Sequence, residues 1–586
     1  LTLAQYPDSA IVASPSTLEA SVSVASVDNV GYFRNHFALG ETKIPYNGGV
    51  DYNSQVETNI LDTMEGQTLE YVPVPGLGEE KDFEGLDLTG KVALVARGSI
   101  NFDVKAANAA AVGAVAIIIY NNTDEGLFYA SLQSHSIPVI TIAKQDVQAM
   151  LDAPEKKITF SSDYYGKALN YNGYQVSSFS SIGPAPDLTI KPEIAAPGGQ
   201  IYSSVIGGGY ETMSGTSMAT PHMAGEAAVL RQYLKETYPN LSDFELGELA
   251  NSLLMSTAVP SLDNGSGTYF SVRRQGAGVA NVYYAIVSGA YLSVEGSNRP
   301  KAEVGSSENG TYTYTATVHN LTDGAKTYSL DTAALVETIT ELNGLNYVAN
   351  SEKRLSASEV NVTYTGLTGN KLTVAANGDA TFTVTIQLTE AGKKYLDGNF
   401  PNGSYVEGFT FLTAEDDEGV SLSVPFLGFY GDWGGLTAFD GDPGEQQNML
   451  GTALADIDTA GSGYFVGVNN TSGAYNESKM AYGPQRGNRQ LVARVSLLRN
   501  FYSVEETVTD EDANLIYTTG DLGMVRKTYG AATQMGIQYT ALLYTPGWTG
   551  HTMKDGVNDA GDWAESGKWY TYTIQATPVG STEPQT

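Results

Sequence analysis

A serine stands between a glycine-containing turn and a helical run in the segment Ser214–Gly225. Gly215 allows the backbone to bend tightly and allows a substrate carbonyl to come close to it. Ser217 is predicted at the start of a helix over Met218–Tyr238, where free N–H groups and the helix dipole favour a developing oxyanion. A serine that attacks a carbonyl carbon in acyl transfer has these needs. Ser217 is therefore a candidate nucleophile, and the alternative for an isolated motif of this type is a helix cap.

His222 is the histidine nearest to Ser217 in the sequence. Five residues along a helix correspond to a rotation of about 140° away from the starting face. The two side chains therefore point in different directions, and we interpret His222 as structural rather than as the base that activates Ser217.

The whole segment Ser214–Gly225 resembles the nucleophile motif of the subtilisin-like serine peptidases, or subtilases. The resemblance continues at Phe179–Pro184, at Lys191–Gly198 and at Gln275–Gly278, where such catalytic domains close. It implies that the backbone N–H of Ser217 also binds the oxyanion.

The resemblance also implies that Gly215, Thr216 and Met218 contact the substrate. In the subtilisin order an aspartate comes first, a histidine second and the serine last. The family sets that aspartate in an Asp-Thr/Ser-Gly context and the histidine in His-Gly-Thr-His, and this sequence contains neither motif. We expect an N-terminal segment of the same protease to supply both residues and the oxyanion asparagine. Residues 1–586 alone are predicted to be inactive.

Three aspartates are candidates for the triad carboxylate, namely Asp8, Asp28 and Asp103. None has the motif around it, and aspartates in surface loops are common. We reject all three.

The composition limits the partners. The chain has 586 residues, 32 basic and 65 acidic side chains and a net charge of −33, which repels nucleic acids and anionic membranes. It has no cysteine and no HExxH pair among its five histidines, so we predict no catalytic metal and no required cofactor. The run Glu415–Glu418 is either a calcium loop or, as we favour, a solvated hairpin tip.

The elements that position the nucleophile follow from the apolar pattern. Residues 91–95 and 115–120 read as buried strands around a helix at 102–111, which is typical of an α/β layer. Residues 10–13 and 20–27 read as β-rich runs, and Asp243–Ser256 reads as a helix. The α/β layer resembles a protease-associated domain inserted into the catalytic domain.

The remainder of the chain is β-rich. Period-2 alternation at 311–318, 380–386 and 568–574 predicts β-sandwiches, and the 37 tyrosines are interpreted mainly as sheet-packing residues. Residues 407–409 and 424–429 resemble the first fibronectin-like domain of subtilases of the C5a peptidase and lactococcal cell-envelope proteinase type.

The predicted fold class is thus multidomain α/β plus all-β, with a partial subtilisin-like catalytic domain and two fibronectin-III-like sandwiches. We expect catalytic segments at 1–45 and 165–290, the insert at 46–164, and sandwiches at 291–435 and 436–586.

The predicted function is hydrolysis of peptide bonds in extracellular proteins through an acyl-enzyme on Ser217. The protein would be secreted or attached to a bacterial cell wall, with a protein or peptide substrate and without membrane insertion. The alternative is a non-catalytic surface module that binds proteins through its β-domains.

Overall fold

The computed structural model divides the chain into two compact units, which are described separately. The insert unit consists of residues 26–180 and 196–224, and the sandwich unit consists of 1–25, 181–195 and 225–586. The structure describes residues 2–54, 56–123, 126–134, 136–170, 173–416, 419–441, 451–458, 463–468, 476, 480–483, 489–533, 536–540, 543–544 and 547–586.

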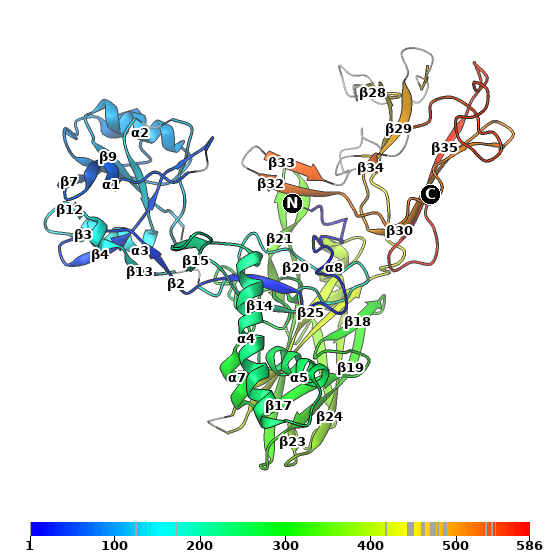
Figure 1. The fold of residues 1–586 in the computed structure, drawn as a ribbon, viewed down its shortest axis with the longest axis horizontal. Helices are drawn as coiled ribbons and strands as arrows, with labels where there is room; N and C mark the ends of the chain where they lie inside the picture. Colours follow the sequence, from blue (N-terminus) through cyan, green and yellow to red (C-terminus); the bar gives the residue numbers. More distant parts are fainter. Residues whose placement is uncertain are drawn as a thin grey trace. The chain divides into compact units, whose positions relative to one another are not determined.

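An eight-stranded sheet forms the centre of the insert unit, in the order β4-β3-β12-β7-β8-β9-β11-β5 (Figure 1). Neighbours β7, β8, β9 and β11 run parallel, and the strands outside them pair antiparallel. The strands are β3 (His36–Leu39), β4 (Thr42–Pro45), β5 (Asn47–Gly48), β7 (Thr68–Pro73), β8 (Val92–Ala96), β9 (Ala116–Tyr120), β11 (Val139–Ile142) and β12 (Lys157–Phe160).

Both faces of this sheet are buried. Val92 and Leu94 pack in the cluster that contains Met150 of α3 (Lys144–Asp152), whereas Ala93 packs with Ala106 of α2 (Phe102–Ala111). Successive side chains of a strand point to opposite faces, so a continuous apolar strand needs a helix on each side. The predicted helix at 102–111 is confirmed, and the two predicted strands are confirmed to within one residue at their ends.

The two N-terminal β-rich runs form less strand than the sequence predicts. The prediction of a strand at 10–13 is wrong: the N–H groups of Ile11 and Val12 both donate to the Ile182 carbonyl, so no ladder forms. The run at 20–27 becomes a strand only from Val24. The short elements of the insert unit are β2 (Gly31–Arg34), β6 (Val50–Asp51), α1 (Leu61–Met64), η1 (Glu80–Phe83), β10 (Ser131–Leu132), η2 (Ser162–Tyr164), β13 (Gly166–Leu169), β15 (Ile201–Ser204) and β16 (Tyr210–Met213). The strands β1 (Val24–Asp28) and β14 (Ile194–Gly199) begin in the sandwich unit and end in the insert unit.

The helix α4 (Thr216–Thr237) begins in the insert unit and ends in the sandwich unit. Three further helices of the sandwich unit come directly after it in the chain. The helix α5 (Asp243–Ser256) has the predicted bounds, because Ser242 and Glu245 form a capping box that fixes its first turn. The helices α6 (Val272–Gln275) and α7 (Val282–Val287) come after it.

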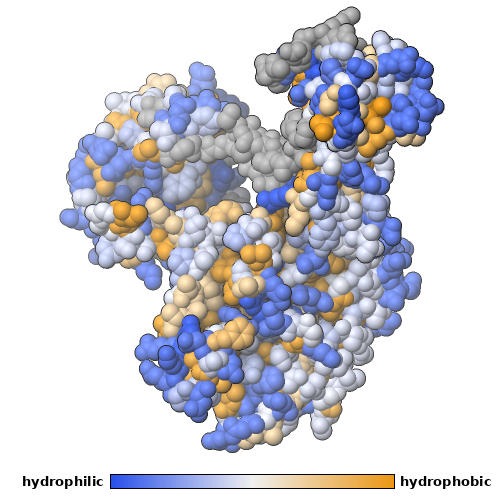
Figure 2. All heavy atoms as spheres, turned by 45° about the vertical axis from the view of Figure 1, so that its right-hand side comes forward, coloured by the Kyte–Doolittle hydropathy of each residue, from blue (hydrophilic) through white to orange (hydrophobic). Residues whose placement is uncertain are grey.

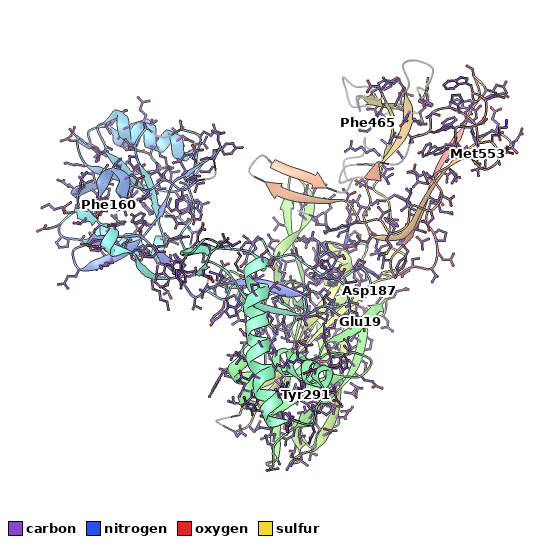
Figure 3. All side chains as sticks on the ribbon, viewed as in Figure 1. Glu19, Phe160, Asp187, Tyr291, Phe465 and Met553 are labelled. Carbon is purple, nitrogen blue, oxygen red and sulfur yellow. The ribbon has the colours of Figure 1, made fainter. Side chains whose placement is uncertain are left out.

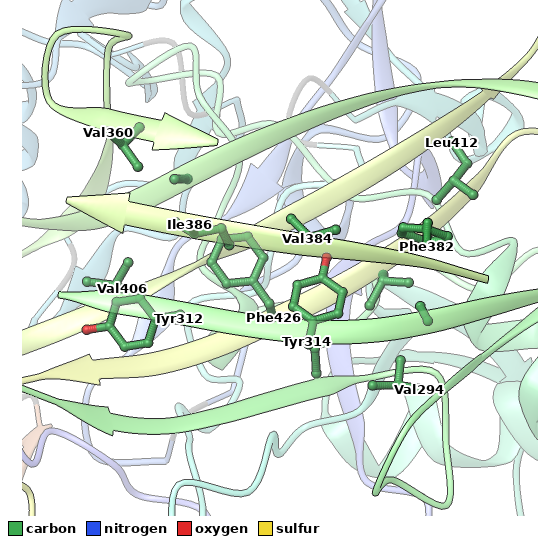
Figure 4. Packing of buried hydrophobic residues seen from close by; sticks show 14 of the residues in the cluster. Val294, Tyr312, Tyr314, Val360, Phe382, Val384, Ile386, Val406, Leu412 and Phe426 are labelled. Atoms are coloured by element: carbon green, nitrogen blue, oxygen red, sulfur yellow. The ribbon is translucent and has the colours of Figure 1, made fainter. Parts of the chain in front are cut away.

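Two sheets face each other in the first sandwich, in the orders β17-β19-β24-β22 and β18-β26-β25-β20-β21, with β23 paired to β20. Tyr312, Tyr314, Phe382 and Phe426 fill the space between them (Figure 4), as period-2 alternation requires. The elements are β17 (Ala290–Val294), β18 (Ala302–Ser307), β19 (Thr311–Asn320), β20 (Lys326–Leu342), β21 (Leu345–Arg354), β22 (Val360–Thr365), β23 (Lys371–Val374), β24 (Asp379–Leu388), α8 (Glu390–Asn399), β25 (Ser404–Ala414) and β26 (Leu422–Tyr430).

The last part of the chain is also all-β where the structure describes it. It contains the sheets β28-β27-β29-β34, β31-β30-β35 and β32-β33. Its strands are β27 (Ala453–Ile457), β28 (Gly463–Phe465), β29 (Gln490–Val495), β30 (Phe501–Thr509), β31 (Leu515–Thr518), β32 (Tyr529–Thr533), β33 (Gly536–Thr540), β34 (Leu543–Tyr544) and β35 (Thr571–Pro578).

A buried ionic cluster joins α6 to the first sandwich. The Arg273 guanidinium lies 2.8 Å from Glu407 Oε1, 3.0 Å from Glu337 Oε1 and 3.9 Å from Glu352 Oε1. It also lies 4.0 Å from the centre of the Tyr405 ring. Among the described residues, Arg273 is the cation in contact with all three carboxylates, and Arg274 acts on Glu352 from farther away.

The charge balance of this cluster predicts a pH-dependent stability. Burial and the charge of Glu407 raise the pKa of Glu352 from 4.5 to about 8, although Arg273 opposes the shift. Because the pKa is raised in the folded state, the stabilisation is full below pH 4.5 and is lost as pH rises through 8. Glu352→Gln is therefore expected to remove this dependence and to stabilise the protein at pH 9 by on the order of 2 kcal/mol. Urea unfolding at a series of pH values from 5 to 9 measures the free energy of unfolding. The prediction is refuted if this free energy falls with pH in the variant as steeply as in the parent.

Candidate nucleophile site

Ser217 is the second residue of α4, and its side chain is exposed. The Gly215 carbonyl accepts hydrogen bonds from the N–H groups of Met218 at 2.9 Å and Ala219 at 3.3 Å, which closes the first turn. Within the residues that the structure describes, the Ser217 N–H donates to no acceptor. The nucleophile candidate therefore presents its hydroxyl and a free N–H at a helix N-terminus, as the motif predicts.

The turn before α4 rests on the segment that follows β14. The Gly215 N–H donates to the Gly198 carbonyl at 2.8 Å, and the Gln200 N–H donates to Ser214 Oγ at 2.9 Å. Gln200 adopts a φ of 61°, and Arg34 of β2 donates to its side-chain Oε1 at 2.8 Å. These bonds fix the backbone that places Ser217.

A small polar layer lies beneath this segment. Asp28 Oδ1 accepts a hydrogen bond from Ser177 Oγ at 2.6 Å, and Ser177 Oγ also lies 2.9 Å from Ser26 Oγ. Burial raises the pKa of Asp28, and the Ser177 hydrogen bond partly opposes this shift. A Cβ on Gly199 would lie 2.0 Å from Asp28 Oδ1 and 3.1 Å from Asp28 Cα. The layer thus packs directly against backbone that has no room for a side chain.

Gly199→Ala is expected to displace this segment and the turn that hydrogen-bonds to it, because a contact of 2.0 Å cannot persist. A displacement of the nucleophile by about 1 Å costs on the order of 100-fold in rate, so fluorophosphonate labelling of Ser217 in the complete protease should slow by that factor. Gly225→Ala is the matched control, since a Cβ there meets nothing within 4 Å. Equal labelling rates for the two variants would disprove the positioning role.

The structure separates the other candidate residues from Ser217. Asp8 forms an ion pair with Lys527, Asp28 binds Ser177, and Asp103 accepts from the Ser134 N–H at 2.9 Å. His222 is exposed in the second turn of α4. Of the described residues, no histidine and no carboxylate is hydrogen-bonded to Ser217 Oγ.

Sequence reasoning missed the residues that support the turn. Ser26 and Asp28 lie about 150 positions from Ser177, and Arg34 lies 166 positions from Gln200. Their residue types are common in loops, so nothing local marks them. Only pairing across the fold brings them together.

In the described part of the chain, no group of three or more His, Cys, Asp and Glu residues is placed to hold a metal ion. Asp417 and Glu418 of the acidic run fall outside that part. No helix of the described residues is long and apolar enough to cross a membrane.

Two bacterial peptidases are similar to this chain in sequence. Over 444 residues the chain is 32% identical to the C5a peptidase of Streptococcus pyogenes. This alignment covers 75% of the chain and 36% of that peptidase. Over 622 residues it is 28% identical to the PI-type proteinase of Lactococcus lactis subsp. cremoris, with 99% and 31% covered. The chain therefore spans about a third of the length of these curated relatives.

Among solved structures, the patellamide maturation protease PatA matches with 32% identity, a TM-score of 0.16, and coverage of 19% of this chain and 37% of that one. The model of the Subtilase family matches residues 4–283, which include Ser217, and the Fn3-like domain model matches residues 303–427. The chain thus carries a domain of the subtilase family of serine peptidases, followed by an Fn3-like domain.

Proposed function

We propose that this chain is the nucleophile-bearing part of a subtilisin-like serine endopeptidase that acts on extracellular proteins. The observation that carries the proposal is the exposed Ser217 in the first turn of α4, with its N–H free of any acceptor among the described residues. A serine hydroxyl and an oxyanion donor are thereby presented on one side of one helix end. The subtilase match across residues 4–283 supports the same reaction class.

In the proposed mechanism, Ser217 Oγ attacks the carbonyl carbon of the scissile peptide bond. The proton leaves Oγ for a histidine, and the negative charge that forms on the carbonyl oxygen is stabilised by the Ser217 N–H. Collapse of the tetrahedral intermediate expels the amine and leaves an acyl-enzyme, which water then hydrolyses. Gly215, Thr216 and Met218 contact the substrate backbone beside the attacked bond.

The base is the part that the described residues do not place beside Ser217. We propose that an upstream segment of the same protease supplies the histidine, the aspartate that orients it and the oxyanion asparagine. A serine without its base is a poor nucleophile at neutral pH, so residues 1–586 by themselves are expected to be inactive.

The finer domain assignment belongs to this proposal. The parallel sheet flanked by α2 and α3 supports a protease-associated insert at 46–164. The all-β segment at 436–586 supports a second fibronectin-like domain. We propose a secreted or cell-wall-attached location, and no cofactor is needed for the chemistry, although a structural calcium ion would be compatible with it.

The competing candidate is a non-catalytic surface module that binds proteins. A degenerate catalytic domain would be expected to lose the nucleophile turn, whereas here Gly215, Thr216 and Ser217 keep the hydrogen-bonded geometry described above. This observation favours the peptidase.

Fluorophosphonate labelling tests the proposal. Residues 1–586 and a longer protein that contains the upstream segment are treated with the probe, and intact masses identify every labelled species. We expect labelling of the longer protein, loss of labelling in its Ser217→Ala variant, and none in the shorter chain. Labelling that persists in Ser217→Ala would show that another residue is the nucleophile, and a longer protein that never labels would favour the binding module.

A further inference from the structure

Four aromatic side chains form a continuous exposed row in the insert unit. Phe33 of β2 contacts Tyr165 at a centroid distance of 6.1 Å and Tyr202 of β15 at 5.0 Å, and Tyr202 stacks on Tyr210 of β16 at 5.6 Å. Their exposed fractions are 37%, 48%, 39% and 66% in chain order. We call these residues the aromatic row. Tyr312 and Tyr405, by contrast, are buried, as the prediction of sheet packing requires.

The row is not explained by the stability of the fold. Rings that serve a core are covered on both faces, whereas these four cover each other only in part and keep large apolar areas in water. Exposed apolar clusters of this kind mark sites that bind another molecule. Figure 2 shows hydrophilic and hydrophobic residues interspersed over the face turned to the viewer.

Three cations lie on the elements around the row. Lys167 pairs directly with Phe33 across the β2–β13 ladder, and Lys43 lies 4.5 Å from the ring centre of Tyr164, the residue before Tyr165. Arg34 follows Phe33 in β2 and lies close to Tyr165, because burial raises the pKa of Tyr165 and the charge of Arg34 partly opposes this shift. Arg34 donates to two neutral groups, Tyr129 Oη at 2.6 Å and Gln200 Oε1 at 2.8 Å. Within the described residues, none of the three forms an ion pair.

The carboxylate of Glu211 and the row tyrosines Tyr202 and Tyr210 lie on opposite faces of the β15–β16 hairpin. Tyr202 pairs with Thr212 and Tyr210 pairs with Ser204, so both tyrosines lie on one face. Glu211 pairs with Ser203 on the opposite face, because neighbouring residues of a strand alternate. In a chain of net charge −33, the aromatic row is therefore a locally cationic and apolar surface.

We propose that the aromatic row and its three cations bind an acidic, apolar segment of the protein substrate outside the cleavage site. Apolar side chains of that segment pack on the rings, and its Asp or Glu carboxylates pair with Arg34, Lys43 and Lys167. This inference rests on the proposed function and adds the chemistry of the substrate.

The position of the row fits this role. Tyr210 precedes Ser217 by seven residues, so their Cα atoms are at most about 25 Å apart along an extended chain. Arg34 also connects the row to the nucleophile turn, through Gln200 and Ser214. A segment held on the row can thus be continuous with the peptide at Ser217. Figure 3 shows the side chains of these strands on the ribbon.

Fluorescence polarisation on the Ser217→Ala variant tests the proposal without any turnover. The probe is a fluorescein-labelled peptide, Gly-Asp-Phe-Asp-Leu-Asp-Gly, and the control probe has Asn in place of each Asp. We expect the acidic peptide to bind about tenfold more tightly than the amide peptide, with the difference falling as salt rises. Equal binding of the two peptides would overturn the proposal.

Variants locate the binding surface. Tyr202→Ala and Arg34→Gln are each expected to weaken binding about tenfold, and Lys167→Gln about threefold. Lys157→Gln is the matched control, because Lys157 is an exposed lysine that is not part of the row or its cations. Its Nζ lies 3.7 Å from Glu155 Oε2. Arg34→Gln removes a hydrogen bond to Gln200 and can therefore disturb the local fold as well as binding. Lys167→Gln leaves that bond in place, so weaker binding in this variant reports on the surface itself.

Two outcomes would contradict the assignment. Lys167→Gln and Tyr202→Ala that bind like Lys157→Gln would show that the peptide binds elsewhere. Binding of an eight-residue oligothymidine in preference to the acidic peptide would show that the rings and cations serve a nucleic acid. Because the measurement needs no catalysis, loss of peptidase activity alone changes neither outcome.

Discussion

Replacement of Ser217 by alanine in the complete protease is expected to lower kcat by about 10⁶-fold, the factor that loss of the serine causes in subtilisin. The reason is that no acyl-enzyme forms once Oγ is absent, whereas the N-terminal N–H groups of α4 remain. KM should change little, because the residues that contact the substrate are intact. Steady-state hydrolysis of a peptide substrate measures both constants.

Ser203→Ala serves as the control for this experiment. Ser203 is an exposed serine in β15 that lies close to Ser217 in the chain but outside its turn. Its kcat should stay within about twofold of the parent, since surface substitutions away from special features have small effects. A Ser217→Ala protein that keeps more than a hundredth of the activity would mean that another nucleophile performs the reaction.

The second large effect concerns stability. Arg273→Met is expected to lower the free energy of unfolding of the sandwich unit by about 3–5 kcal/mol. Arg273 is 3% exposed and is the cation that faces Glu337, Glu352 and Glu407. Methionine fills a similar volume but leaves buried carboxylates without a counter-charge, and that penalty exceeds the loss of the hydrogen bonds themselves.

Urea unfolding monitored by circular dichroism measures this change, and Arg354→Met is the matched control. Arg354 is half-exposed and pairs with Asp331 at 3.2 Å, so its loss should cost less than about 0.5 kcal/mol. The destabilisation in Arg273→Met should shrink at acidic pH, because protonated glutamates no longer need the cation. Similar midpoints for the two variants would show that water enters the cluster.

The sequence alone determined the features that are local. The turn and the first part of the helix that carry Ser217 are encoded by the twelve consecutive residues Ser214–Gly225, and the start of α5 is marked by a capping box four residues long. The α/β layer and the first sandwich follow from apolar periodicity, because burial on two faces or on one face leaves a different pattern in each strand. Local patterns of this kind need no knowledge of the rest of the chain.

Tertiary structure decided what depends on partners far away in the sequence. Residues 10–13 look like a strand, but the N–H groups of Ile11 and Val12 both donate to the Ile182 carbonyl and the Ala10 N–H donates to Asp8, so no strand ladder forms. The aromatic row collects Phe33, Tyr165 and Tyr202 from segments more than 30 positions apart, and its cations are equally scattered. No sequence window contains such groups, because sheet register and chain crossing place them side by side. The nucleophile could therefore be found by reading the sequence, whereas the surface proposed to select its substrate could not.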